Sequence, residues 1–70
     1  MNIPTQPIKA IDSAKAGAII RHKREAKGLA LIRLAARMKL SNGYLCDLEQ
    51  GKRNWTQKLF SKALEKIESE

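Results

Sequence analysis

The chain has 70 residues, enough for one small domain. Cys46 is its only cysteine and His22 its only histidine, so one chain can form neither an internal disulfide nor a four-ligand zinc site. Fourteen Lys and Arg against seven Asp and Glu give a net charge of +7. A basic protein attracts polyanions by releasing their counterions, which makes nucleic acid one candidate partner.

The positive charge is concentrated in the body of the chain. Residues 13–62 contain twelve Lys and Arg but only three acidic residues. The alternative interpretation is an ordinary solvated surface on a helical protein. No apolar run approaches the roughly 18 residues of a membrane span, and prolines and polar residues interrupt the N-terminal isoleucines where a secretory signal would lie. With a lone thiol, the sequence predicts a cytoplasmic protein.

Residues 1–12 contain both prolines and no helical periodicity. Proline disfavours helix for the residue before it, so we expect an extended N-terminal arm over residues 1–12 and a folded domain over residues 13–70. The arm would either follow nucleic acid, with Lys9 near a phosphate, or be a frayed terminus.

The first helix is predicted over about residues 14–26, with Asp12 or Ser13 as its N-cap. Gly28 then supplies a left-handed stop. Gly17 inside this helix costs up to about 1 kcal/mol relative to alanine, which indicates that another helix packs closely against it.

Two short helices follow. One is predicted over about residues 31–39; the next begins after the N-cap Ser41 and ends at Gly51. Their inward-facing residues are Leu34, Ala35 and Met38 in the former and Leu45 and Leu48 in the latter.

The last helix is predicted from the N-cap Thr56 to about Glu68. Its apolar positions, which share one face, are Leu59, Phe60, Ala63, Leu64 and Ile67. Trp55 and Phe60 form either a hydrophobic staple that closes the core or exposed anchors of a dimer. The fold class is therefore all-α, a compact four-helix domain.

Only residues 39–41 separate the second and third predicted helices. So short a turn forces the two helices to cross steeply, as in a helix-turn-helix. That motif lays one helix over the DNA backbone and inserts the next into the major groove.

A series of residues in register supports this interpretation. They are Gly17-Ala18-Ile19-Ile20-Arg21, Arg24, Gly28-Leu29, Leu34-Ala35, Leu40-Ser41, Tyr44-Leu45, Leu48-Glu49 and Gly51-Lys52-Arg53. Through these residues the chain resembles the lambda repressor-like (XRE, Cro/CI-type) family of helix-turn-helix proteins. The resemblance implies a lambda repressor-like DNA-binding fold.

The resemblance also implies roles for individual residues. The positions that approach base edges are Asn42, Gly43, Tyr44 and Asp47, with Cys46 close by. The positions that contact phosphates are Leu31, Arg33, Lys39, Lys52 and Arg53. Arg24 and Glu49 match a charge pair that joins the first helix to the end of the third.

The chemistry of two of these residues can be argued separately. Asn42 can bind adenine N6 and N7 with two hydrogen bonds, which discriminates against other bases by about 1–3 kcal/mol. Asp47 is repelled by phosphates, so it either accepts a hydrogen bond from cytosine N4 or orients Arg53 or Lys52.

The sequence departs from the family pattern at several places. Ala30 replaces a Ser or Thr cap before the second helix, Lys39 stands where a left-handed glycine is frequent, and Trp55 replaces a proline. One final helix is predicted where many relatives have two, which leaves the dimer interface open.

We therefore expect a sequence-specific regulator of transcription that binds double-stranded DNA, acting as a repressor and autoregulator. It would bind an inverted repeat as a homodimer through the major groove, in a phage or mobile element such as those that carry anti-CRISPR genes. One alternative is an antitoxin-like protein that holds a partner through Leu31, Ile32 and Trp55. Another is an RNA-binding helical module.

The sequence offers no foothold for catalysis, because it has no nucleophile–base pair, phosphate-binding glycine loop or carboxylate cluster. We expect no enzyme activity, cofactor, metal or small-molecule substrate. His22 is interpreted as a solvated residue. Cys46 is either a redox switch beside DNA or, as favoured here, a small neutral residue in a tight interface.

Overall fold

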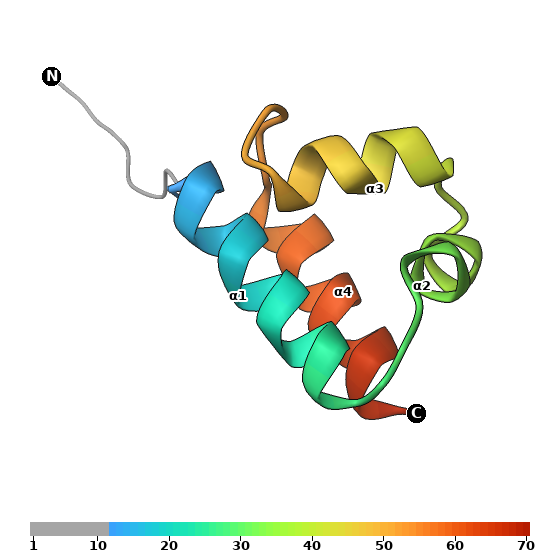
Figure 1. The fold of residues 1–70 in the computed structure, drawn as a ribbon. Coiled ribbons are helices and arrows are strands. Elements are labelled where there is room, and N and C mark those ends of the chain that lie inside the picture. Colours follow the sequence, from blue (N-terminus) through green and yellow to red (C-terminus); the bar gives the residue numbers. More distant parts are fainter. Residues whose placement is uncertain (1–11) are drawn as a thin grey trace, which may run out of the picture.

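The computed structural model describes residues 12–70 and contains four helices and no strand within that range. They are α1 (Ser13–Ala26), α2 (Leu31–Met38), α3 (Asn42–Glu49) and α4 (Gln57–Glu68) (Figure 1). The predicted all-α, four-helix architecture is confirmed. The arm predicted over residues 1–12 falls outside the described residues, except for Asp12.

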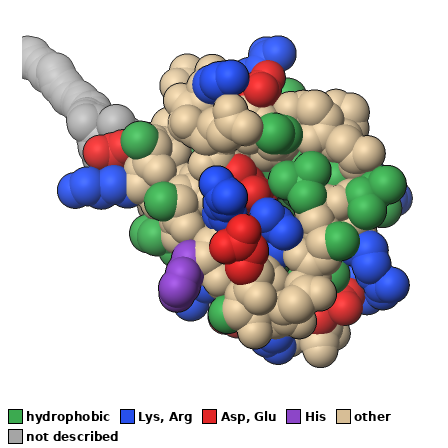
Figure 2. Space-filling view, in the orientation of Figure 1, with side chains coloured by type: hydrophobic (Ala, Val, Ile, Leu, Met, Phe, Trp, Pro, Cys, Tyr) green, Lys and Arg blue, Asp and Glu red, His purple; other side chains and the backbone are tan. Residues whose placement is uncertain are grey.

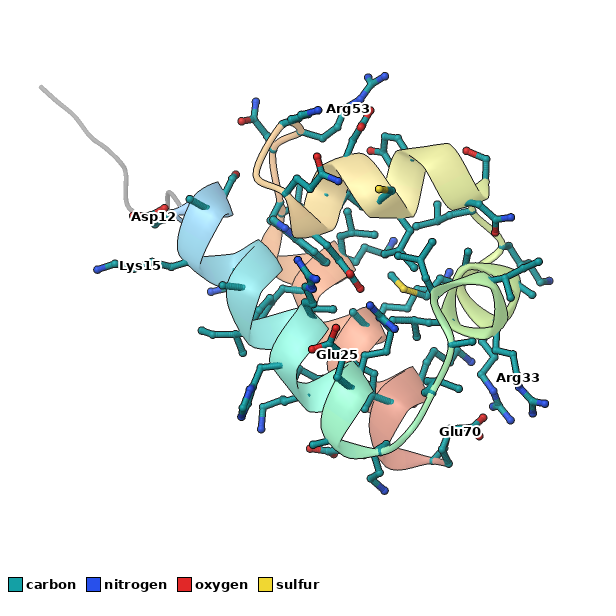
Figure 3. The ribbon with its side chains drawn as sticks, viewed as in Figure 1. Asp12, Lys15, Glu25, Arg33, Arg53 and Glu70 are labelled. Carbon is teal, nitrogen blue, oxygen red and sulfur yellow. The ribbon has the colours of Figure 1, made fainter. Side chains whose placement is uncertain are left out.

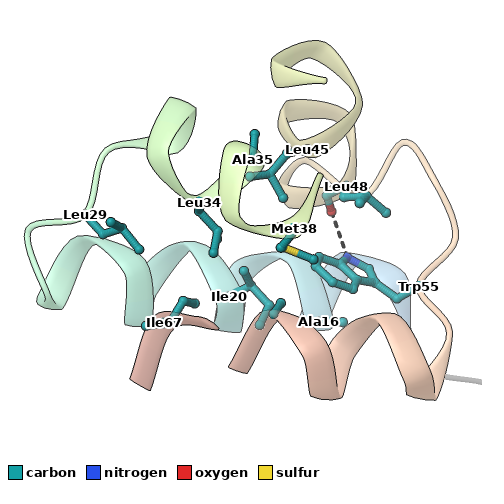
Figure 4. Close-up of a cluster of buried hydrophobic side chains, with 11 residues drawn as sticks. Ala16, Ile20, Leu29, Leu34, Ala35, Met38, Leu45, Leu48, Trp55 and Ile67 are labelled. Carbon is teal, nitrogen blue, oxygen red and sulfur yellow. Dashed lines mark hydrogen bonds between the residues drawn. The ribbon is translucent and has the colours of Figure 1, made fainter. Parts of the chain in front are cut away.

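The long helices α1 and α4 lie side by side, and the short helices α2 and α3 cover the upper part of this pair (Figures 1 and 4). In Figure 1 α2 is viewed end-on while α3 lies across the view, so the two helices cross steeply. The turn that joins them contains Lys39, Leu40 and Ser41. This is the helix-turn-helix arrangement that the short connection predicts.

All four helices and the loop after α3 contribute to one core (Figure 4). Its buried members are Ala16, Ile20, Leu29, Leu34, Ala35, Met38, Leu45, Leu48, Trp55, Ala63 and Ile67. The interior is closely packed aliphatic material with a single indole, so small changes of volume or backbone position are felt throughout.

Trp55 belongs to this interior. Trp55 is 4% exposed, and its Nε1 donates to the Leu48 carbonyl at 2.9 Å (Figure 4). Its ring meets that of Phe60 edge-to-face, with the ring centres 5.9 Å apart. Its backbone N–H donates to Ser13 Oγ at 3.0 Å. The interpretation of Trp55 as an exposed dimer anchor is therefore wrong, because its ring is buried in the core. Phe60 is half-buried.

Gly17 lies where α1 crosses the end of α3. A Cβ atom placed on Gly17 would come within 2.6 Å of the Glu49 carbonyl oxygen and closer still to that of Leu48. Both obstacles are backbone atoms, which cannot rotate away. The close helix packing expected at Gly17 is confirmed.

Helix α2 begins and ends without the residues that usually stabilise helix ends. Its N-cap, Ala30, provides no side-chain hydrogen bond, and its C-cap, Lys39, has φ 59° in the left-handed region. The Leu40 N–H nevertheless donates to the Ala35 carbonyl at 2.9 Å, which closes the helix end. Both departures read from the sequence at these positions are present in the structure.

No helix in the described part of the chain is long and apolar enough to cross a membrane.

Candidate nucleic-acid interface

The amino end of α3 is capped and exposed. Ser41 Oγ accepts a hydrogen bond from the Tyr44 N–H at 3.1 Å, as expected for the N-cap. Asn42 and Gly43, the first two residues of the helix, are both exposed, whereas Leu45 faces the core. The first turn therefore presents an amide side chain, backbone N–H groups and the positive end of the helix dipole to the surroundings.

The carboxyl end of α3 is held by a buried ion pair. Arg24 Nε donates to Glu49 Oε2 at 2.8 Å and Arg24 Nη2 to Glu49 Oε1 at 3.1 Å. Arg24 Nη1 also donates to the Leu29 carbonyl at 2.8 Å. The Glu49 side chain is 4% exposed, so the pair is nearly dry. The ion pair that the family resemblance implies is confirmed.

The hydrogen bonds with Glu49 raise the pKa of Arg24 above its ordinary value, against the opposing effect of burial. Arg24 loses its proton only at very alkaline pH. The higher pKa in the folded state therefore stabilises the protein at every pH below that range. The guanidinium thus remains a permanent positive partner for Glu49. Together with the close approach at Gly17, this pair fixes α3 against α1.

Arg53, in the loop after α3, lies above the helix that carries Tyr44 and Asp47 (Figure 3). Its guanidinium carbon is 5.3 Å from the centre of the Tyr44 ring, and its Nε is 3.6 Å from Asp47 Oδ2. Tyr44 and Asp47 are half-buried, while Arg53 is exposed. Of the two roles considered for Asp47, this geometry fits the orientation of Arg53.

Lys52 is exposed beside Arg53, and its backbone N–H donates to the Asp47 carbonyl at 2.8 Å. Gly51 precedes it with φ 79°, a left-handed conformation that L-residues rarely adopt. After the turn at Gly51 come two consecutive basic residues, of which Arg53 lies over α3 and Lys52 is exposed beside it in the loop.

Leu31 and Cys46 come together around a small hollow of about 170 Å³, which Arg21, Arg24 and Gln50 also line. Cys46 is half-buried, and Gln50 Nε2 lies 3.1 Å from its Sγ in a hydrogen bond. Leu31 is the first residue of α2, so the structure brings this predicted phosphate contact next to the middle of α3.

The structure does not bring Arg33 into this group. Arg33 Nη2 lies 4.0 Å from Glu70 Oε1, and Arg37 forms an ion pair with the same carboxylate. Figure 3 shows Arg33 and Glu70 near one edge of the molecule and Arg53 at the opposite edge. Lys39, the remaining predicted phosphate contact, is exposed at the end of α2.

Sequence reasoning missed a basic groove next to Tyr44. Tyr44, Asn54, Thr56, Leu59 and two lysines of α4 line a hollow of about 300 Å³. The lysines are Lys58 and Lys62. Their i, i+4 spacing on the polar face of an amphipathic helix was a usable signal, but only the fold places them next to α3.

Elsewhere the surface charge is mixed. Basic and acidic side chains lie next to each other near the middle of the face in Figure 2, and Arg21 pairs with Glu25 at 3.2 Å. Such exposed pairs neutralise each other and hold little affinity for a polyanion. Within residues 12–70, no three His, Cys, Asp or Glu side chains gather into a possible metal site.

The exposed apolar side chains bear on the partner-holding alternative. Of the three contacts suggested for it, Trp55 is buried and Leu31 is half-buried, whereas Ile32 is 59% exposed. The proposed protein-binding surface therefore loses its aromatic member.

No family model matches the sequence, and no curated protein matches it either. Solved structures do. The clp gene regulator ClgR from Corynebacterium glutamicum superposes with a TM-score of 0.78 at 29% identity, over 83% of this chain and 74% of that one. The restriction-modification controller protein C.AhdI from Aeromonas hydrophila superposes with a TM-score of 0.73 at 32% identity, over 81% of this chain and 86% of that one.

Three observations indicate the same family: α3 is capped and exposed, a buried ion pair joins it to α1, and the fold matches two helix-turn-helix relatives. The chain belongs to the lambda repressor-like (XRE) family of helix-turn-helix proteins.

Proposed function

We propose that this protein is a sequence-specific regulator of transcription that binds double-stranded DNA with α3 in the major groove. The observation that carries the proposal is the exposed first turn of α3 with Asn42 at its tip, together with Arg53 over the Tyr44 ring and the exposed Lys52 next to Arg53 in the loop. An amide side chain reads base edges, while flexible cations bind the phosphates on either side. The two structural relatives are named as a gene regulator and a controller protein, which supports a regulatory role.

We assign direct base contact to Asn42 and close backbone approach to Gly43. Tyr44, Asp47 and Cys46 lie further along α3 and are half-buried, so they shape the reading surface and contact bases only at its edge. Lys52, Arg53 and Lys39 bind phosphates, and the amino end of α2 at Leu31 offers backbone N–H groups to another. Asp47 holds Arg53 over Tyr44 so that the guanidinium is already oriented when DNA arrives.

The finer part of the proposal is a homodimer that acts as a repressor on an inverted repeat. Two copies of α3 reach the same face of DNA when their half-sites lie about 10 base pairs apart, centre to centre. Occupying such a site within a promoter is enough to block transcription, so the chain needs no further chemistry. The half-buried Phe60 on α4 is the remaining aromatic candidate for contact between protomers. A small autoregulator of a phage or mobile element fits this description.

The test begins with selection of bound sequences from a random duplex library, followed by mobility shifts with the enriched site, unrelated DNA and RNA as competitors. We expect an inverted repeat to be enriched and unrelated duplex or RNA to compete only weakly. Light scattering of the protein alone and on the site gives the number of protomers. Absence of any preferred duplex would refute the proposal. Preferred binding of RNA would refute it in favour of an RNA-binding module.

Substitutions at the tip of α3 and in the basic loop separate base reading from phosphate binding. Asn42→Ala should change the preferred base at one position of each half-site, with a discrimination loss of about 1–3 kcal/mol. Arg53→Ala should weaken binding to all duplexes by a similar factor and leave the preferred sequence unchanged. Gln57→Ala, which removes an exposed amide from α4, is the control and should leave the preferred bases unchanged.

A further inference from the structure

The groove between α3 and α4 differs in the charge of its walls from two other hollows on the described part of the chain. Its charged lining residues are Lys58 and Lys62, and no carboxylate lines it. The hollow at the carboxyl ends of α1 and α4 contains Glu68 besides two lysines, and the one beside Cys46 contains Glu49. Of these three hollows within residues 12–70, the groove at Tyr44 therefore has the simplest attraction for an anion.

The groove is also continuous with the surface that meets DNA in the proposed function. Tyr44 forms one wall of it and at the same time supports Arg53. Asn54 follows Arg53 directly in the loop, and Thr56 caps α4 by accepting from the Leu59 N–H at 3.0 Å. An anion in the groove would thus be next to the strand of phosphates that Arg53 binds.

The two lysines are spaced to follow an extended anion. Lys58 and Lys62 stand four residues apart on α4, on one face and roughly 6 Å apart along the helix axis. Both are exposed, and the chain places no ion-pair partner on either of them within the described residues. A nucleic-acid backbone, which carries charge at regular intervals, suits such a pair better than a single small anion.

We infer that Lys58, Lys62 and the groove they line form a second phosphate clamp, which binds the DNA backbone beyond the part held by Lys52 and Arg53. The inference rests on the proposed function, because it takes α3 to be the helix that meets DNA. It extends the interface along α4 and adds about two phosphate contacts per protomer. These contacts carry no base information, so they set affinity and salt dependence rather than sequence preference.

The test compares how binding to the selected duplex depends on salt concentration. The logarithm of the binding constant falls with the logarithm of salt concentration, with a slope of about 0.9 per phosphate neutralised. Replacing both lysines, as Lys58→Gln with Lys62→Gln, should make this slope less steep by about 2 per protomer and weaken binding at low salt. The preferred sequence should stay the same. Ethylation interference should lose one cluster of phosphates at the flank of each half-site.

A control with the same change in net charge is available at the other end of the molecule. Lys23 and Lys27 are exposed and line the hollow near the carboxyl ends of α1 and α4. Lys23→Gln with Lys27→Gln should leave the slope and the interference pattern within error of the wild type. Circular dichroism of both double variants checks that the fold is intact, as expected for exposed lysines.

The outcomes distinguish the clamp from the proposed function. If the wild type prefers a duplex but the α4 variant keeps its slope and interference pattern, the clamp is refuted and the proposed function stands. If both double variants lose slope equally, the effect is one of net charge and the clamp is also refuted. If the wild type prefers no duplex at all, both proposals fall.

Discussion

The two helices of the helix-turn-helix are both eight residues long, yet they are held in place by different means. Helix α2 has no side-chain cap at Ala30 and ends on the left-handed Lys39. Its stability comes from the burial of its inward face. Helix α3 is capped by Ser41 and is fixed at its other end by the ion pair of Glu49.

These two kinds of support differ in how narrowly they fix the position of a helix. Burial holds the inward face of a helix against the core, but apolar contacts are not directional and set the orientation of the helix less narrowly than hydrogen bonds do. Hydrogen bonds and close backbone contacts have defined geometry, so they fix α3 more narrowly. In the proposed function α3 reads base edges and needs that accuracy, since its exposed amino end is aligned by contacts at its buried carboxyl end. The comparison predicts that α3 is easily damaged by losing specific contacts and that α2 can be improved by adding them.

The largest expected effect is at the ion pair. Glu49→Ala leaves the buried Arg24 guanidinium with the Leu29 carbonyl and, 4.0 Å away, the exposed carboxylate of Glu25, and we expect a loss of about 3–5 kcal/mol in the free energy of unfolding. Urea denaturation followed by circular dichroism measures this. Glu25→Ala removes the exposed partner of Arg21 and a carboxylate 4.0 Å from Arg24, and because Glu25 is exposed it should cost no more than about 0.5 kcal/mol. Equal losses in the two variants would mean that burial of the Arg24–Glu49 pair is unimportant.

The next effect is at the crossing of α1 and α3. In Gly17→Ala the new methyl group would meet the carbonyl oxygens of Leu48 and Glu49, so the helices must separate, at a cost of about 1–3 kcal/mol or more. Gly43→Ala is the matched control, since nothing lies within 4 Å of a Cβ atom there. Alanine is the better helix former, so the control should be neutral or more stable by up to about 1 kcal/mol. Both midpoints come from the same denaturation experiment, and a tolerated Gly17→Ala would contradict the close packing.

A gain is expected from giving α2 the cap that it lacks. Ala30→Ser places a hydroxyl where it can accept a hydrogen bond from a backbone N–H of the first turn. We expect this to stabilise the folded protein by about 1 kcal/mol. The reverse change at the other helix, Ser41→Ala, should cost a similar amount because it removes the bond to the Tyr44 N–H. Thermal denaturation of the two variants would show shifts of opposite sign. Two shifts of the same sign would remove the contrast between the helices.

The smallest effect is at the left-handed residue. Lys39→Gly relieves the steric cost of φ 59° but increases the freedom of the unfolded chain, so the net stabilisation should be about 0.5–1 kcal/mol. Lys39→Ala removes the same charge and keeps the Cβ atom, which makes it the control with no gain in stability. Duplex affinity of the two variants then reports on the positive charge alone. Equal stability of the Lys39→Gly and Lys39→Ala variants would mean that the left-handed backbone at residue 39 carries no strain.

The approximate helix boundaries, the caps at Ser41 and Thr56 and the uncapped start of α2 could be predicted from the sequence, which left the cap of α1 open between Asp12 and Ser13. The structure assigns that cap to Asp12, whose side chain accepts a hydrogen bond from the Lys15 N–H. These features depend on residues within one or two turns of each other, so their signals are local. Gly17 also gave a correct expectation, because a glycine inside a helix has few explanations other than close packing. Arg24 and Glu49 were paired through resemblance to a family and not through any local pattern.

Which distant side chains meet could not be predicted from the sequence and is seen only in the folded structure. It placed Trp55 beneath α3 with its N–H on the Leu48 carbonyl, where the sequence left open an exposed dimer anchor. It turned Arg33 towards Glu70 and set Lys58 and Lys62 beside Tyr44. Periodicity tells which face of a helix is polar, but the rotation and crossing of neighbouring helices decide what that face adjoins. Those quantities come from packing of the whole core, so no single segment of the sequence contains them.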